Sequence, residues 1–111
     1  MWWGGAAENG WGVAVMQQNA TLFMIWFTYD ARNQPAWWVM PGGRWTDANT
    51  YEGRIHRPFG SAWLDRVFDS GRIQAPDLGP FRLRFESDDR LTLEYSILGR
   101  SGQLNLTRQP F

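Results

Sequence analysis

Apolar and polar side chains alternate along much of this chain with a period of two, and turn residues recur about every ten positions. Successive side chains of a β-strand point to opposite faces, so this period is typical of strands rather than helices. Helical spacing is almost absent. We therefore predict eight strands: Trp2–Gly4, Trp11–Gln17, Leu22–Asp30, Ala36–Trp45, Thr50–Arg57, Phe81–Glu86, Leu91–Leu98 and Gln103–Arg108.

Most connections between these strands are short and polar, such as Gln18-Asn19-Ala20 and the Asp30–Gln34 turn, where Asn33 suits a left-handed position. Short connections join antiparallel neighbours, and closing a sheet on itself removes its exposed edges. We predict a single domain over residues 1–111, an all-β, up-and-down antiparallel barrel of about eight strands. At that strand number side chains nearly fill the interior, and we expect these to fill it: Met24, Trp26, Trp38, Met40, Leu83, Leu93 and Tyr95.

The segment from Phe59 to Pro80 is too long for a hairpin turn, so we predict a long, partly helical loop there. Ser61–Phe68 carries a capping serine and apolar residues at helical spacing, which favours two turns of helix. Trp63 and Val67, with Leu64 as a third candidate, would then lie on one side and plug an open end of the sheet.

The two halves of the chain populate their strand faces differently. In the C-terminal strands, apolar residues such as Leu83 oppose charged ones such as Arg84, as in a wall packed on one side and wet on the other. In the N-terminal strands both faces are apolar, so both need cover. The face opposite Met24 and Trp26 carries Phe23, Ile25, Phe27, Tyr29, Trp37 and Val39. The cover is either the 59–80 segment, a second copy of the chain, or a ligand or partner protein.

All eight tryptophans lie within the first 63 residues. An indole offers a large apolar face that fills a core or forms a platform for a ligand. Four of them fall near strand ends, where they would line the mouth of the barrel for a sugar or a small apolar ligand: Trp3, Trp11, Trp45 and Trp63.

Composition excludes several classes of function. Eleven basic and eleven acidic residues balance, which argues against nucleic-acid binding. Without cysteine there is no disulfide, thiolate nucleophile or zinc knuckle. No apolar run approaches the roughly 20 residues of a membrane span.

Catalytic and metal-binding signatures are equally weak. His56 is the one histidine, on a strand face shared with Glu52 and Arg54, so no nucleophilic triad or typical zinc site can be built. Six acids could form a glycosidase pair, but nothing in their spacing selects two of them: Glu8, Asp30, Glu52, Asp65, Asp69 and Glu94. We expect a protein that is not an enzyme and holds no cofactor or metal.

Several motifs together resemble a tryptophan-rich β domain that recurs in bacterial exported proteins. The matching stretches are Trp2-Trp3, Glu8–Gly12, Thr21–Asp30 and Pro35–Trp38, followed by the closing Thr107–Phe111. Gly4-Gly5 departs from the family's Asn-Pro, and Asn33 replaces its turn glycine. The resemblance implies a secreted or periplasmic protein and a modular, often tandem context, although this chain starts without a signal peptide. It supplies no catalytic or ligand residues, and a looser similarity to avidin-type and lipocalin barrels concerns the fold alone.

The sequence thus favours a non-catalytic binding or assembly module. It would self-associate, or bind a partner, through the outward aromatic face of its N-terminal strands. The alternative is a barrel that binds carbohydrate or another small ligand at a tryptophan-lined mouth.

Overall fold

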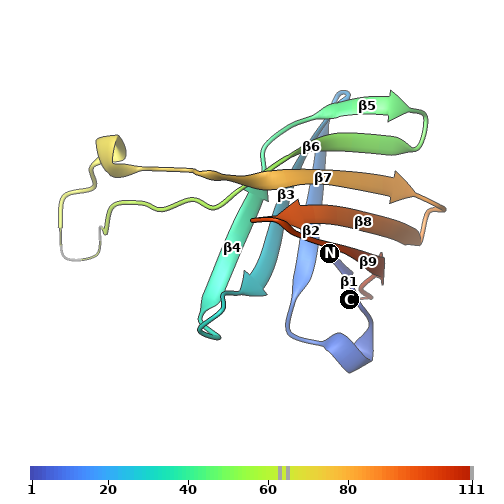
Figure 1. Cartoon of the computed structure of the whole chain (residues 1–111), viewed down its shortest axis with the longest axis horizontal. Helices are drawn as coiled ribbons and strands as arrows, with labels where there is room; N and C mark the ends of the chain where they lie inside the picture. The colour runs from blue at the N-terminus through green and yellow to red at the C-terminus, as the bar shows by residue number, and fades with distance from the viewer. Residues whose placement is uncertain (63, 65, 111) are drawn as a thin grey trace.

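The computed structural model describes residues 1–62, 64 and 66–110, which form a closed antiparallel β-barrel with one additional outer strand (Figure 1). Eight strands make the ring, each antiparallel to its neighbours, in the order β1, β2, β3, β4, β6, β7, β8, β9 and back to β1; β5 pairs with β6 outside it. The predicted up-and-down barrel is therefore confirmed. The elements are β1 (Trp2–Trp3), η1 (Ala6–Glu8), β2 (Gly12–Gln18), β3 (Thr21–Tyr29), β4 (Pro35–Met40), β5 (Arg44–Asp47), β6 (Thr50–His56), η2 (Ser70–Arg72), β7 (Asp77–Phe85), β8 (Arg90–Ile97) and β9 (Arg100–Arg108).

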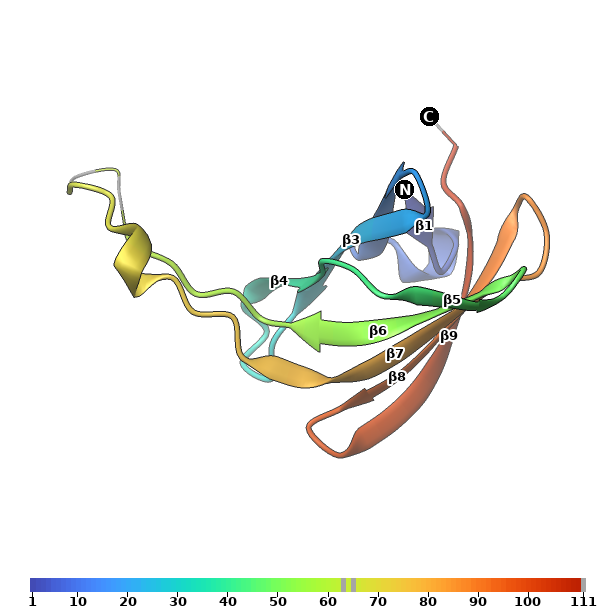
Figure 2. The ribbon, with the colours of Figure 1, turned by 90° about the horizontal axis from the view of Figure 1, so that it is seen from above.

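Two walls make up the barrel, and their strands cross steeply (Figure 1). The N-terminal strands β2 to β4 form one wall, and β6 to β9 form the other. Inward side chains of both walls meet between them, as in orthogonally packed sheets. The chain ends lie together: the backbone N–H of Gln109 donates to the Met1 carbonyl at 2.9 Å, and Figure 2 shows both ends on one side of the barrel.

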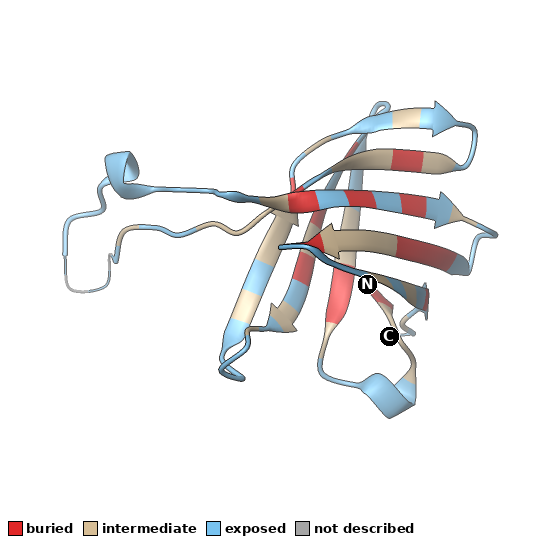
Figure 3. Cartoon of the chain, in the orientation of Figure 1, coloured by how far each residue is buried: buried red, intermediate tan, exposed pale blue. Residues whose placement is uncertain are grey.

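The interior is filled as the alternation predicts. All seven residues expected inside lie in the core or pack against it, and bands of buried residues alternate with exposed ones along β7 (Figure 3). Trp2 belongs to this core: it is 4% exposed, its ring meets Phe85 edge-on, and the Arg108 guanidinium lies 4.6 Å from the ring centre. The short β1 thus anchors the closure between β2 and β9.

The single strand predicted over Ala36–Trp45 is wrong, because Pro41-Gly42-Gly43 divides it into β4 and β5. Proline has no N–H for a ladder, and glycine permits close approach of two backbones. A Cβ atom on Gly53 of β6 would lie 2.5 Å from the Gly42 carbonyl oxygen. The chain therefore bends away from β3 yet stays along β6, with Val39 paired to His56 before the bend and Trp45 paired to Tyr51 after it.

Tyr51 fills the gap that this bend leaves beside β3. Its side chain is fully buried, and its hydroxyl accepts from the Leu22 N–H at 3.1 Å and donates to the Leu22 carbonyl at 3.4 Å. Next to it, the Trp45 indole N–H donates to the Ala20 carbonyl at 2.8 Å. Side chains thus satisfy backbone groups that lie beyond the end of β4.

Residues 57–76, which we term the arm, project from the barrel as a narrow two-legged extension (Figures 1 and 2). Phe59 and Gln74 exchange backbone hydrogen bonds of 2.7 and 2.8 Å, and the Arg57 N–H donates to the Pro76 carbonyl at 3.1 Å. The arm leads into β7 at Asp77, earlier than the predicted start at Phe81.

The predicted helix over Ser61–Phe68 is wrong: none of its described residues is helical, and the short η2 follows instead. Ser61 does not cap a helix, because its hydroxyl accepts from the Asp69 N–H across the arm at 3.1 Å. Leu64 and Val67 are 81% and 91% exposed, so they plug nothing. Trp63 lies outside the described residues. A helix of two turns is marginal without a surface to pack on, and Leu64 and Val67 pack on none among the described residues.

Candidate functional site

Strand register gathers all six predicted interface residues on one outer surface. Phe27 lies opposite Trp37 and Ile25 opposite Val39, while Met16 of β2 lies opposite Phe23. Alternate residues of the same strands, including Met24 and Met40, are fully buried. We call this surface the outer aromatic face; it comprises Met16, Phe23, Ile25, Phe27, Tyr29, Trp37 and Val39.

The four rings of this face are substantially open to solvent. Phe23 is 38% exposed, Phe27 43%, Tyr29 51% and Trp37 50%. Because each aromatic side chain presents 150–250 Å² when free, they display roughly 350 Å² of aromatic surface. Ile25 and Val39 fill the space between them and are half-buried. A continuous apolar patch of several hundred Å² is typical of an interaction surface.

A hollow of about 230 Å³ lies at one end of the face, between the β2 entry and the β3–β4 turn. Its lining residues include Phe27, Tyr29 and Trp37. The Tyr29 hydroxyl donates to the Gly10 carbonyl at 3.0 Å, which fixes the ring at the rim. Small-molecule sites usually start at about 300 Å³, so this hollow matches one large apolar side chain.

The turn beside the hollow is held by Asp30. Its carboxylate accepts backbone N–H bonds from Arg32 at 2.8 Å and Gln34 at 3.0 Å, and the Arg57 guanidinium lies 3.6 Å away. The bond from Gln34, then that from Arg32, with the charge of Arg57, lowers the pKa of Asp30 below its ordinary 3.8. Asn33 adopts the expected left-handed conformation, with φ of 61°. Asp30 thereby joins the rim of the face to the root of the arm.

The outside of the opposite wall has a contrasting chemistry. Arg54 pairs with Asp77 at 2.9 Å, Arg82 with Glu52 at 2.6 Å, and Arg84 with Glu94 at 2.7 Å. The hydrogen bond from Arg54 lowers the pKa of Asp77, and that to Glu52 raises the pKa of Arg82. These charges neutralise one another at a wet surface, as the clean alternation of those strands predicts.

His56 and Asp69 take part in contacts within the arm and at its root, and Glu52 and Glu94 both contact Arg82. The His56 Nδ1 lies 3.1 Å from the Ala75 carbonyl, which can only accept, so the ring donates there and holds the root of the arm. Asp69 pairs with Arg72 at 3.5 Å, and Asp65 lies outside the described residues. Among the residues that are described, no three His, Cys, Asp or Glu side chains are grouped to hold a metal ion.

Two residues of the predicted tryptophan-lined mouth, Trp11 and Trp45, lie toward opposite ends of β2. Trp45 bonds to Ala20, just beyond the end of β2, whereas Trp11 precedes the start of β2. The seven residues of β2 separate these two positions by roughly 20 Å. Trp3 follows the buried Trp2 and so points to the other side of β1, and Trp63 lies outside the described residues.

Two buried indole N–H groups escaped the sequence analysis. The Nε1 atoms of Trp26 and Trp38 have no hydrogen-bond partner in the described structure. Their rings meet edge-to-face, with centres 5.1 Å apart, an arrangement compatible with weak N–H···π contact. Both nitrogens are fully covered by protein, so they do not open onto a ligand cavity.

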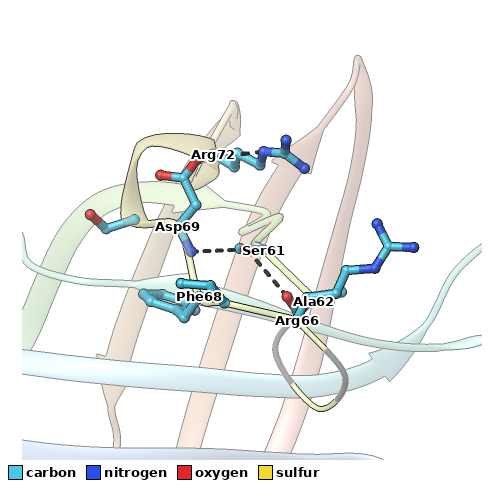
Figure 4. A pocket seen from close by; sticks show the side chains of 8 residues that line it. Ser61, Ala62, Arg66, Phe68, Asp69 and Arg72 are labelled. Atoms are coloured by element: carbon cyan, nitrogen blue, oxygen red, sulfur yellow. Dashed lines mark hydrogen bonds and ion pairs between the residues drawn. The ribbon is translucent and has the colours of Figure 1, made fainter.

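A larger hollow of about 560 Å³ is formed by the tip of the arm alone (Figure 4). Ser61 and Asp69 tie its two sides together, and Arg72 is already paired to Asp69. Because no barrel residue lines this hollow, we do not place the functional site there.

Comparison with known proteins gives no relative: no family model, no curated protein and no solved structure matches the chain. Within the described residues, no helix has the length and apolar character needed to cross a bilayer.

Proposed function

We propose that this domain is a non-catalytic assembly module that self-associates through its outer aromatic face. The observation that carries the proposal is the set of four half-exposed rings on adjoining strands, which the described part of the chain leaves uncovered. At about 25 cal/mol/Å², covering roughly 350 Å² yields about 9 kcal/mol of gross hydrophobic free energy. Association consumes a large share of this gain.

The chemistry of the face favours protein over sugar. Carbohydrate platforms combine a ring with polar groups, but the Tyr29 hydroxyl already donates within the chain, and the seven side chains of the face carry no charge. A second copy suits it because the formal net charge of zero puts no overall repulsion between identical chains. A two-fold contact also presents the same patch twice.

Replacing Phe27 with arginine tests this proposal. We expect the wild-type chain to form a dimer or larger species at high concentration, and Phe27→Arg to raise its dissociation constant by 30-fold or more, because a charge enters an apolar contact. Sedimentation or light scattering over a concentration series measures this. Trp37→Arg provides a second variant at a half-exposed position, and circular dichroism establishes that each remains folded.

Gln103→Arg is the matched control, because it adds the same charge to the outside of β9 on the opposite wall. It should leave association unchanged. A wild-type chain that stays monomeric at high concentration contradicts the proposal. A change in tryptophan fluorescence on adding glycans that persists in Trp37→Arg would favour the alternative of a tryptophan-lined mouth, and one lost in Trp37→Arg would make the outer aromatic face itself a carbohydrate platform.

A further inference from the structure

The arm carries a second set of exposed apolar side chains. Leu64 and Val67 are almost fully exposed, Phe68 is 54% exposed, and Phe59 and Ile73 are about half exposed. Scattered single apolar residues are ordinary on a surface, but five on one narrow projection are not. The arm therefore has the character of a contact element without its partner.

The root of the arm is fixed so that the arm points away from its own barrel (Figures 1 and 2). Four interactions hold it there: the paired Phe59 and Gln74, the Arg57 N–H to Pro76, the His56 ring to Ala75, and Arg57 to Asp30. The first three of these join the two legs to each other and make the root a paired ribbon, whereas Arg57–Asp30 ties it to the β3–β4 turn. Folding the arm back over its own outer aromatic face would bend this ribbon sharply and break the contact with Asp30. At the same time, the pairing of Val39 with His56 places the root beside that face.

The exposed area of the outer aromatic face is too small to form a stable interface alone, so a second apolar element must contribute. A stable protein interface buries about 800 Å² on each partner, whereas the exposed rings supply less than half of that. The described leg from Arg57 to Ala62 reaches about 20 Å when extended, and three neighbouring strands span only about 10 Å between their axes. The arm is therefore long enough to cross the face of another molecule.

The geometry points to reciprocal arm exchange: the arm of one copy packs Leu64, Val67 and Phe68 on the outer aromatic face of a second copy, and the second copy does the same. This inference rests on the proposed self-association and names its contact. The hollow between Tyr29 and Trp37 receives one of the arm's large side chains. Two equivalent contacts around a two-fold axis close the dimer without exposing a further face.

Engineered cysteines test the contact directly, because the natural chain contains none. Tyr29→Cys and Val67→Cys chains of different mass are mixed and treated with a short bismaleimide. We expect a mixed cross-linked dimer. Val67→Cys with Gln103→Cys, which lies on the opposite wall, should give little product. A double Tyr29→Cys/Val67→Cys chain that cross-links only within itself would overturn the inference.

Charges on the arm give an independent measurement. Leu64→Asp combined with Val67→Asp should raise the dissociation constant as strongly as Phe27→Arg, at least 30-fold. Arg66→Gln alters the charge of the same arm without removing apolar surface and should leave association nearly unchanged.

The two variants separate failure of this inference from failure of the proposed function. If Phe27→Arg abolishes the dimer while the double aspartate variant and the cross-linking have no effect, the face pairs with itself and arm exchange is wrong. If the wild-type chain is monomeric, both proposals are wrong.

Discussion

Single side chains take the place of backbone partners where β4 leaves β3. The Tyr51 hydroxyl serves both the N–H and the carbonyl of Leu22, and its ring is wedged against Trp45 and Phe81. A buried backbone group that loses its partner costs about 1–3 kcal/mol. The Tyr51 hydroxyl therefore contributes to the stability of the wall at the point where β3 has no neighbouring strand.

We expect Tyr51→Phe to lower the free energy of unfolding by about 1–3 kcal/mol. Tyr29→Phe removes a hydroxyl bond at the surface, where water substitutes, and should cost less than about 0.5 kcal/mol. Urea unfolding of both variants at low protein concentration, in the Phe27→Arg background that is expected to weaken association, measures the free energy of unfolding of the single chain. If both variants lost the same free energy of unfolding, the bonds from Tyr51 to Leu22 would not be what stabilises the contact between β3 and β6.

At this scale the sequence predicts which way a side chain points better than what it touches. Inward Met24 and outward Phe27 follow from alternation, which is a local property of a strand. The bond between Tyr51 and Leu22 joins residues 29 positions apart. Such a bond depends on how the two walls cross, and the spacing of residue types along the sequence does not predict that crossing.

Among the elements, the β3–β4 turn combines local and long-range interactions. A lowered pKa means that the charged form of Asp30 stabilises the fold. This contribution is fully present above the ordinary pKa of 3.8 and is lost as the pH falls through the lower pKa of the folded state.

We therefore expect Asp30→Asn, which keeps one acceptor oxygen but removes the charge, to lower the melting temperature at neutral pH. The difference from wild type should close as the pH falls below 3.8. Thermal unfolding across this pH range measures the effect. A difference that persists into strong acid would assign the effect to turn geometry rather than to charge.

Strand positions were predictable because period two and turn residues are local signals. The division into β4 and β5 also had its signal in Pro41-Gly42-Gly43, which we read as part of a strand. The helix expected over Ser61–Phe68 failed for a different reason. Apolar spacing creates a helix only where a surface receives its apolar side, and the described arm extends into solvent.

At the scale of the whole molecule, two tryptophans have different expected roles, one in folding and one in association. Trp2 is buried and anchors the closing strand, whereas Trp37 is 50% exposed on the outer aromatic face. Trp2→Ala should cost about 3–5 kcal/mol of unfolding free energy. Trp37→Ala should change it by about 1 kcal/mol or less while raising the dissociation constant tenfold or more. Chemical unfolding and sedimentation measure the two effects, and a folded, monomeric Trp2→Ala would contradict this separation.

The global shape was only partly accessible from the sequence. Closure of the barrel was predictable because the edge strands of an open antiparallel sheet expose unpaired backbone N–H and carbonyl groups. The scattering of Trp3, Trp11 and Trp45 depends on strand tilt, which composition does not encode. The projection of the arm depends on its root contacts. Two of these involve residues that the sequence analysis had singled out, His56 and Asp30, but neither was expected to hold an arm.

The adjoining chain ends have a consequence for valency. The ends lie together at one side of the barrel, well away from the tip of the arm (Figures 1 and 2). A flexible tether attached at either end would leave the arm unobstructed. At the N-terminal end it would start beside the outer aromatic face, because Met1 lies against Gly12, the β2 partner of Phe27. Copies strung on one polypeptide would then meet at millimolar effective concentration, so a contact too weak to hold two free molecules together would still produce a stable network.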